Sequence, residues 1–411
     1  MNLAQKFASN KPLSVISSAF MMLLPITMIG GFTALFRGLD FGGYQAFLAS
    51  SGLYDRLGTI YQFTTSFFAV YVAFAIAYQY ALRYELKSNA IAMGLTAVMC
   101  FFIATPYTLP ESLYGAATLD TTWHGATGLF SSIIIAFMVG IIYKLCAKWH
   151  IEIKLPEAVP PAIAVQFTSI IPAAVSAIVT MLIAWGFSAT SLGSIHNAIY
   201  TIIRTPLTAF GANIFGQFIF TLFCYILWFM GIHGGLAVMP ISMVLFTQLQ
   251  MENQMAYAAG QPLPNWVTGS NLSVSSGSLA VVVACLLVAK SDQINAISRT
   301  AIIPSMFGVD EPAYFGLPMI LNPIFFLPWV VIQTCLTTWG TYLLQAIGVL
   351  GYYRGVSAGS FVPFFVSNLA GYGVPGLIWG FVIFAIDVII SIPFVAVYDK
   401  QLLAQEKSNK E

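Results

Sequence analysis

The chain has 411 residues, of which 58% are hydrophobic and only 8% are charged, whereas about 25% of the residues in soluble domains are charged. This composition indicates a polytopic membrane protein and excludes a soluble globular domain. The net charge of +1 argues against a nucleic-acid partner. The five cysteines are widely spaced and form no CxxC or Cys/His pattern, so we expect them to pack in the interior and predict neither a metal site nor a cofactor.

The first half of the chain predicts five membrane crossings. Each of five nearly uncharged runs is close to the ~20 residues that a helix needs to span a bilayer. Lys6 and Lys11 precede the first run, which is too long to be the core of a cleaved signal. The runs cover residues 15–35, 63–82, 90–105, 128–143 and 165–187.

The charges of the loops predict the orientation. Residues 106–123 contain no Lys or Arg, whereas basic residues occur in the connections on either side of this segment. Lys and Arg are enriched in cytoplasmic loops, so we expect both termini in the cytoplasm. Twelve of the sixteen basic residues then lie inside, namely Lys6, Lys11, Arg83, Lys87, Lys144, Lys148, Lys154, Lys290, Arg299, Lys400, Lys407 and Lys410.

After residue 187 the pattern changes. Leu192, Ile195, Ile199 and Ile202 recur at helical spacing between polar residues, which is typical of an amphipathic helix in the membrane interface. We expect this helix to link two domains, residues 1–190 and residues 191–411.

The second domain combines clean and broken apolar segments. Clean runs cover residues 214–232, 325–347 and 374–396, but residues 279–289 form a run of only eleven, and five prolines interrupt residues 304–328. Irregular backbone at membrane depth is tolerated only where it is buried in protein or lines a cavity, and broken segments often mark a transporter's binding site. The sequence therefore predicts an all-α polytopic membrane protein whose site lies in its second half.

Two ionisable residues stand in apolar sequence within this half. An ionisable side chain at membrane depth is costly and suggests a functional site. His233 fits either a functional group or a packed core histidine, because Gly231, Gly234 and Gly235 permit close helix packing. Glu311, directly before Pro312 and flanked by apolar residues, needs a partner, a water or a ligand hydroxyl.

Two other acids have alternative interpretations. Asp310 could pair with Glu311, but we favour a capping role for it, at the start of a helix with Pro312 in its first turn. Asp387 could be a packed, hydrogen-bonded group or part of a proton path.

Three further polar or aromatic residues are candidates for sugar contact. Asn213 and Gln217 lie one helical turn apart and could bind a sugar or form interhelical hydrogen bonds. Trp379 could stack on a pyranose ring, although the interfacial aromatic belt explains it as well.

Three motifs carry a resemblance that covers nearly the whole chain. They are WFMGIHGG at residues 228–235, SVSSGS at 273–278 and FGVDEPAYFGLPMILNP at 307–323. In order and spacing they resemble the enzyme IIC permeases of the bacterial phosphoenolpyruvate-dependent sugar phosphotransferase system, in the lactose, cellobiose and diacetylchitobiose branch.

The resemblance implies an architecture. It predicts a homodimer in the bacterial plasma membrane, with about ten transmembrane helices, two re-entrant hairpins and the amphipathic helix in each subunit. The first domain would be the dimerisation scaffold, and the second would carry the sugar across the bilayer by an elevator-like movement.

The resemblance also implies the roles of the site residues. His233 and Glu311 would bind the sugar near the hydroxyl to be phosphorylated, while a phosphocysteine on a separate enzyme IIB protein supplies the phosphoryl group. We expect Glu311 to be the base and His233 to orient the hydroxyl. The full set of predicted sugar contacts is His233, Glu311, Asn213, Gln217, Ser276, Gly277, Asp310 and Trp379.

The chain departs from the family at two points. Asp310 stands where the family usually has Asn before the Glu, and the Ser/Gly turn at residues 273–278 is less rich in glycine than usual. A second carboxylate can alter the protonation of its neighbour or the choice of sugar. A β-linked disaccharide such as cellobiose, chitobiose or lactose is the first choice, with another glycoside or a monosaccharide as the alternative.

Two other functions stay open. A proton-coupled transporter would use Asp387 and Glu311 as a relay and release unmodified sugar. A membrane sugar sensor would bind the sugar without transporting it.

Overall fold

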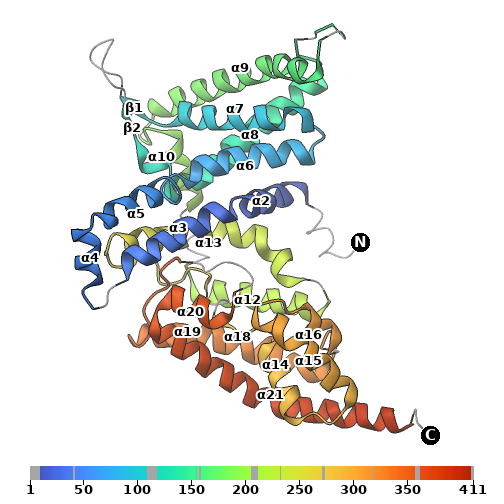
Figure 1. The fold of residues 1–411 in the computed structure, drawn as a ribbon. Helices are drawn as coiled ribbons and strands as arrows, with labels where there is room; N and C mark the ends of the chain where they lie inside the picture. Colours follow the sequence, from blue (N-terminus) through green and yellow to red (C-terminus); the bar gives the residue numbers. More distant parts are fainter. Residues whose placement is uncertain are drawn as a thin grey trace. The chain divides into compact units, whose positions relative to one another are not determined.

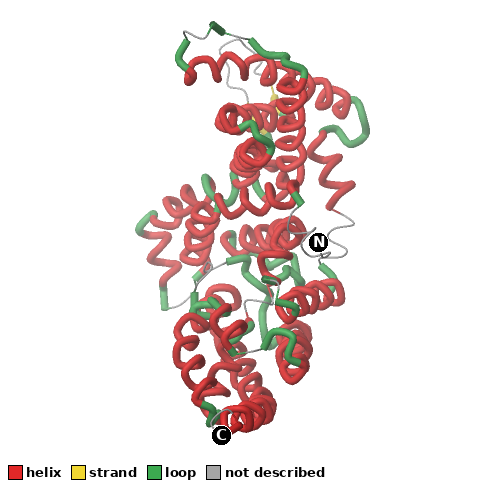
Figure 2. Tube along the Cα trace, turned by 90° about the vertical axis from the view of Figure 1, so that its right-hand side faces the viewer, coloured by secondary structure: helices red, strands yellow, loops and turns green. Residues whose placement is uncertain are grey.

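The computed structural model describes residues 10–39, 42–108, 118–153, 155–156, 159–204, 212–231, 233–270, 274–317, 319–356 and 362–408. These residues are mostly helical (Figure 2). The strands among them form one short antiparallel pair, β1 (Tyr107–Thr108) and β2 (Thr118–Leu119). The predicted all-α class is confirmed.

The chain divides into two compact units. The first comprises Met1–Thr33, Asp40–Ala209 and Met243–Met251, and the second comprises Ala34–Leu39, Phe210–Ser242 and Glu252–Glu411. The functional roles predicted for the two halves of the sequence remain predictions.

The helices of the first half follow the apolar runs of the sequence. The first run forms two helices, α2 and α3, which are bent by 50° relative to each other. Ser194 caps the helix at the predicted amphipathic segment by accepting a hydrogen bond from the Asn197 backbone N–H, at 3.1 Å. The helices are α2 (Lys11–Met22), α3 (Leu24–Gly38), α4 (Tyr44–Ser50), α5 (Leu53–Gln62), α6 (Phe68–Arg83), α7 (Ala90–Ala104), α8 (Leu129–Lys148), α9 (Pro161–Ser188) and α10 (Ile195–Ile199), with short 3-10 turns η1 (Lys87–Asn89), η2 (Thr121–Trp123) and η3 (Ala126–Gly128) and a π-helical turn η4 (Tyr200–Arg204).

Small residues allow the central helices of the first unit to approach closely. Helix α6 packs against α7 and α8, and α7 also packs against α9 (Figure 1). A Cβ atom on Gly94 would come within 2.6 Å of the Phe74 ring, and one on Gly140 within 2.7 Å of the Tyr80 ring. Such glycines let helix backbones approach in a membrane, where packing replaces the hydrophobic effect between helices.

The second half contains the broken segments. The helix from Pro323 to Ala346 includes two π-helical stretches, η6 and η7, which are frequent at functional sites. The elements are α12 (Ile214–Phe229), α13 (Gly234–Ala258), α14 (Leu279–Val288), α15 (Asp292–Met306), α16 (Glu311–Gly316), α17 (Pro323–Phe325), η6 (Phe326–Ile332), α18 (Gln333–Cys335), η7 (Leu336–Gly340), α19 (Thr341–Ala346), α20 (Phe364–Tyr372) and α21 (Val374–Ser408).

Helix α13 was not predicted, since the clean apolar run was expected to end at residue 232 and the next apolar run to begin only at residue 279. The structure forms 25 residues of helix there. Within the second unit, Asn253 near the end of this helix donates hydrogen bonds to the carbonyl oxygens of Asn265 and Tyr353, at 2.8 and 2.7 Å. Polar side chains that have such hydrogen-bond partners can be buried in a packed helix. Hydropathy does not show these partners, and it therefore did not predict α13.

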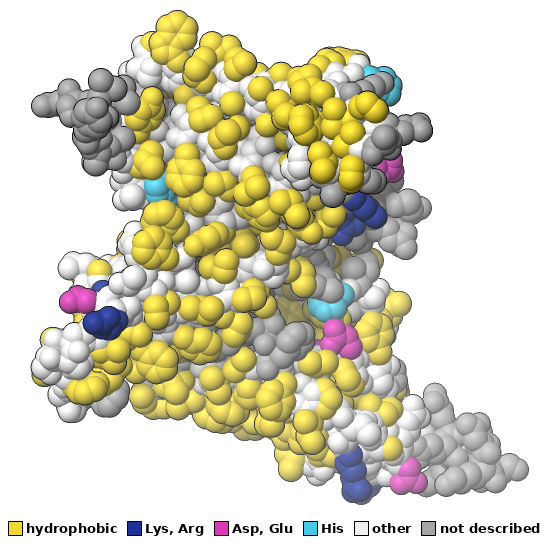
Figure 3. Space-filling model, turned by 45° about the horizontal axis from the view of Figure 1, so that its top comes forward, with side chains coloured by type: hydrophobic (Ala, Val, Ile, Leu, Met, Phe, Trp, Pro, Cys, Tyr) yellow, Lys and Arg dark blue, Asp and Glu magenta, His cyan; other side chains and the backbone are white. Residues whose placement is uncertain are grey.

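Several helices have the length and composition of membrane spans. Five helices in the described residues are long and apolar enough to cross a bilayer, and α2 with α3 gives a sixth if the bent pair is one span. Three shorter apolar helices are α6, α12 and α14. Hydrophobic side chains cover much of the face seen in Figure 3, as expected for a surface that contacts lipid.

Candidate functional site

One wall of the candidate site is the turn at residues 275–278, which directly precedes helix α14. Gly277 in this turn has a φ of +56°, a conformation that glycine adopts without steric cost. A Cβ atom on Gly277 would also lie only 2.6 Å from both carboxylate oxygens of Asp310. The glycine therefore allows the turn at residues 275–278 to pack directly on the acidic segment before α16.

His233 and Glu311 meet in the structure. The Nε2 atom of His233 lies 3.2 Å from Oε1 of Glu311. Glu311 is the first residue of α16, and His233 directly precedes α13, after the turn at Gly231. Their side chains are 37% and 43% exposed, so a ligand can reach the pair.

An aromatic cluster lies behind this pair. The Trp228 ring lies 4.1 Å from the His233 ring and 4.9 Å from the Tyr314 ring, measured between centroids. Tyr314 in turn lies 4.4 Å from Trp329. The cluster fixes the imidazole against an apolar wall while its Nε2 atom faces the carboxylate.

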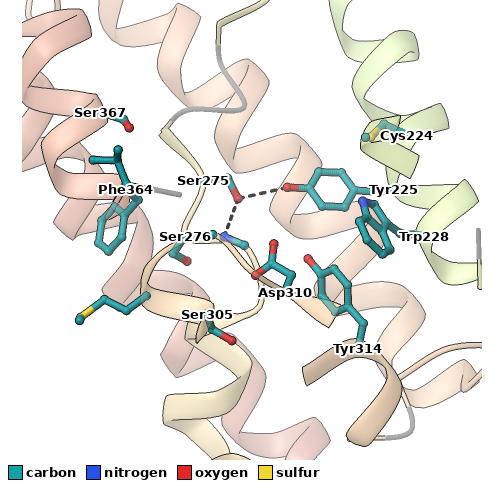
Figure 4. A pocket seen from close by; sticks show the side chains of 15 residues that line it. Cys224, Tyr225, Trp228, Ser275, Ser276, Ser305, Asp310, Tyr314, Phe364 and Ser367 are labelled. Atoms are coloured by element: carbon teal, nitrogen blue, oxygen red, sulfur yellow. Dashed lines mark hydrogen bonds between the residues drawn. The ribbon is translucent and has the colours of Figure 1, made fainter. Parts of the chain in front are cut away.

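A cavity of about 360 Å³ adjoins the pair and lies within the second unit. Hydroxyl groups, one carboxylate and aromatic rings line it, and no Lys or Arg occurs among the described lining residues. Figure 4 shows the side chains converging from different helices. The lining residues are Cys224, Tyr225, Trp228, Gly235, Ser275, Ser276, Gly277, Ser305, Met306, Gly308, Asp310, Tyr314, Val362, Phe364 and Ser367.

Hydrogen bonds define the shape of the turn that forms one wall. The Ser275 hydroxyl oxygen lies 3.1 Å from the Tyr225 hydroxyl and accepts from the Gly277 backbone N–H at 3.1 Å (Figure 4). Gln333 donates to both Ser275 Oγ and the Gly277 carbonyl oxygen, each at 3.0 Å. The Ser276 hydroxyl, by contrast, is buried without a hydrogen-bond partner in the described part of the chain.

Asp310 stands at the N-cap position of α16, which begins at Glu311 as predicted, but the predicted capping by its side chain is wrong. Its side chain forms no cap hydrogen bond, and its backbone is α-helical rather than extended. Pro312 has no N–H to offer at the second helical position. The Asp310 carboxylate instead accepts from the backbone N–H and the hydroxyl of Ser278, at 2.8 and 2.7 Å.

The structure brings together five of the eight predicted sugar contacts. Ser276, Gly277 and Asp310 line the cavity, and His233 and Glu311 adjoin it through their neighbours Trp228 and Asp310.

The other three predicted contacts lie elsewhere. Asn213 caps α12 by accepting from the Phe215 backbone N–H at 2.9 Å, and Gln217 donates to Thr221 at 3.0 Å. Trp379 donates to the Thr341 hydroxyl at 3.1 Å. None of the three lines this cavity.

Several lining residues were not anticipated from the sequence. Tyr225 precedes Trp228 by three positions on α12, so the two share a helix face, and this spacing could have pointed to Tyr225. Ser275 lies in the Ser/Gly motif that was recognised. Ser305 and Phe364 gave no signal, because only tertiary packing brings α15 and α20 to the cavity.

Asp387, the third predicted intramembrane acid, is buried in α21 and does not line the cavity. Its Oδ2 atom has no hydrogen-bond partner among the described residues. Its two predicted roles, a packed hydrogen-bonded group or part of a proton path, stay predictions.

Comparisons with known proteins agree with the motifs. The family model "Phosphotransferase system, EIIC" matches residues 17–332. The oligo-beta-mannoside-specific EIIC component of Bacillus subtilis (strain 168) is 30% identical, over 98% of this chain and 93% of that protein. The cellobiose-specific EIIC component of Geobacillus stearothermophilus is 28% identical, over 100% of this chain and 94% of that protein.

A solved structure is similar over nearly the full length. It is the crystal structure of the transporter ChbC, the IIC component from the N,N'-diacetylchitobiose-specific phosphotransferase system, with a TM-score of 0.90 and 30% identity over 98% of this chain and 97% of that chain. The resemblance found in the sequence is thereby confirmed, and the chain belongs to the EIIC family of phosphotransferase-system sugar permeases.

Proposed function

We propose that this protein imports a β-linked disaccharide, such as cellobiose, chitobiose or lactose, and presents it for phosphorylation by a separate phosphorylated enzyme IIB protein. The observation that carries the proposal is the His233–Glu311 pair, 3.2 Å apart, beside a cavity lined with hydroxyl groups. Its described lining holds no Lys or Arg, which suits an uncharged polyhydroxyl substrate better than an anionic one.

Phosphoryl transfer assigns complementary roles to the pair. A sugar hydroxyl oxygen attacks the phosphorus of the IIB phosphocysteine, and the phosphorus–sulfur bond breaks as the new oxygen–phosphorus bond forms. The hydroxyl proton passes to the Glu311 carboxylate, while His233 orients the hydroxyl. A loose transition state leaves mainly positioning and charge stabilisation to the protein.

The cavity supports a sugar as the ligand. Its volume of about 360 Å³ lies in the lower part of the usual ~300–1,000 Å³ range for small-molecule sites. The Ser275 hydroxyl and the rings of Trp228 and Phe364 provide a polar and an apolar contact for a pyranose. The relatives named for oligo-beta-mannoside and cellobiose favour a β-linked disaccharide.

The two-unit organisation supports an elevator-like transport cycle in a homodimer. The second unit contains every residue that lines the cavity, so the sugar can travel with this unit as a rigid body. The first unit is then the dimerisation scaffold, and both termini face the cytoplasm. With S275C in a background without the native cysteines, sugar binding should protect the new thiol, and a thiol reagent should reach it from either side of the membrane.

The enzyme IIB partner is a separate protein in this proposal. The lactose-specific EIICB component of Streptococcus mutans serotype c combines a IIC and a IIB component in its name, which supports a IIB protein as the partner. Phosphorylation assays with candidate phosphorylated IIB proteins, after a binding screen of β-linked disaccharides, test the assignment. Accumulation of free sugar would instead support proton coupling, and binding without flux would support a sensor.

A further inference from the structure

We infer that Asp310 is a positioning residue, which ties the turn at residues 275–278 to helix α16 and so sets the place of Glu311, rather than a ligand of the sugar. The effect of Asp310 on phosphorylation rests on the proposed function, whereas the hydrogen bonds of Asp310 do not depend on it. The Asp310 carboxylate was predicted to cap α16, but it forms no cap hydrogen bond to the first turn of that helix.

One carboxylate oxygen of Asp310 accepts hydrogen bonds from both the backbone N–H and the hydroxyl of the buried residue Ser278. Asp310 Oδ1 accepts from the Ser278 backbone N–H at 2.8 Å and from the Ser278 hydroxyl at 2.7 Å. Ser278 is fully buried, with 0% of its surface exposed. Hydrogen bonds to a charged acceptor are roughly twice as strong as bonds between neutral groups, so this contact holds the two segments together firmly.

The network continues away from the carboxylate. Because the Ser278 hydroxyl donates to Asp310, its oxygen accepts from the Ser305 hydroxyl, 2.8 Å away. Ser305 is also buried and belongs to α15. The start of α14, the end of α15 and the start of α16 therefore meet at Ser278.

The turn at residues 275–278 packs closely against the Asp310 carboxylate, which therefore cannot move toward the turn. An added Cβ on Gly277 would lie 2.6 Å from each Asp310 carboxylate oxygen, so the carboxylate packs against the glycine backbone. On its other side the Tyr314 hydroxyl points toward Asp310 (Figure 4). Hydrogen bonds and packing thus fix Asp310 from more than one direction.

Both members of the proposed catalytic pair depend on this arrangement. Glu311 follows Asp310 in the chain and begins α16. Tyr314 lies 4.9 Å from Trp228, whose ring lies 4.1 Å from His233. Asp310 can therefore influence the carboxylate through the backbone and the imidazole through two aromatic rings, without touching the sugar.

A displacement of about 1 Å in a catalytic group can cost on the order of 100-fold in rate. The inference predicts that D310A lowers kcat for IIB-dependent phosphorylation about tenfold to a hundredfold while the sugar Kd stays the same. S278A, which keeps the backbone N–H, should lower kcat less. D310N keeps one acceptor oxygen but loses the charge, so it should fall between wild type and D310A.

A double-mutant cycle separates positioning from ligand binding. If Asp310 acts through Ser278, the D310A/S278A double variant loses no more activity than D310A alone, because contacting residues couple. Effects that multiply independently, or a D310A variant with weaker sugar binding and normal kcat at saturating sugar, would overturn the inference. The matched control is D292N, since Asp292 lies at the start of α15 and outside the cavity lining.

Hydrogen exchange provides a readout that does not need phosphorylation. Loss of the contact should accelerate amide exchange in residues 275–279 and 311–316 of the purified full-length protein in both D310A and S278A, because local opening becomes easier. D310N is the variant to use if D310A does not fold. Unchanged exchange in both segments would overturn the positioning role, whereas a wild-type protein that phosphorylates no sugar would overturn only the proposed function.

Discussion

His233 Nε2 and Glu311 Oε1 lie 3.2 Å apart although they belong to different segments of the second unit. The turn at Gly231 places the histidine before α13, and the segment from Asp310 to Pro312 places the glutamate at the start of α16. In the proposed function, a sugar hydroxyl at this contact loses its proton to Glu311 while His233 orients it.

Replacing Glu311 by Gln should separate sugar binding from phosphorylation. The amide keeps the size and one hydrogen-bond acceptor of the carboxylate but accepts no proton, so E311Q should retain measurable sugar binding and lose phosphorylation by a factor of about 100 or more. Calorimetric titration with the sugar and an assay of IIB-dependent phosphorylation measure the two properties. Substantial turnover in E311Q would exclude Glu311 as the base.

Trp228 and Trp379 should respond differently to the same substitution. W228F removes the indole that lines the cavity beside His233, and loss of such an aromatic contact should weaken sugar binding about threefold to tenfold. W379F removes a hydrogen bond to Thr341, at 3.1 Å, away from the cavity. It should lower the melting temperature without changing the sugar Kd. Equal losses of affinity in the two variants would contradict this placement of the cavity.

Replacing Gly277 by Ala should damage the site. The position has a φ of +56° and an added Cβ would meet the Asp310 carboxylate at 2.6 Å. G277A should therefore weaken sugar binding and lower the melting temperature, since strained backbone costs on the order of 1–3 kcal/mol. The matched control is G186A in α9, where an added Cβ meets nothing within 4 Å. Normal sugar binding by G277A would show that the turn does not shape the site.

His196 should make the stability of the protein depend on pH. Burial, followed by the nearby charge of His124, lowers the pKa of His196 from 6.5 to about 4. Because the unfolded chain binds this proton more readily, the histidine's contribution is complete above pH 6.5 and disappears as the pH falls toward about 4.

The size of the effect follows from the shift in the pKa. A change from 6.5 to about 4 corresponds to up to about 3 kcal/mol. The melting temperature of the detergent-purified protein should fall between pH 7 and pH 5, and H196Q should reduce that dependence. An unchanged pH dependence in H196Q would assign the effect to other groups.

The sequence was sufficient to predict the membrane class and to single out the two ionisable residues that the structure brings into contact. The long apolar runs predicted α7, α8 and α9 because a lipid-facing helix must be apolar along its whole length. His233 and Glu311 stood out for the same reason, since an ionisable group in apolar sequence has few structural explanations. The family resemblance implied that the two lie close together, and the structure adds the 3.2 Å contact between them.

Other features could not be predicted because their partners are distant in the chain. Asp310 looked like a helix cap in its local sequence, but its two donors come from Ser278. The clean apolar run was expected to end at residue 232, yet α13 follows it, and its Asn253 donates to the carbonyl oxygens of Asn265 and Tyr353. Local sequence shows which groups need hydrogen bonds and does not show which distant residue provides them.

The most direct test of the account follows a labelled β-linked disaccharide into proteoliposomes that contain the purified protein and enclose a phosphorylated IIB protein. If the protein couples import to phosphorylation, the label accumulates inside as sugar phosphate, uptake depends on the IIB phosphocysteine, and E311Q abolishes it. Accumulation of unmodified sugar without IIB would contradict the central claim.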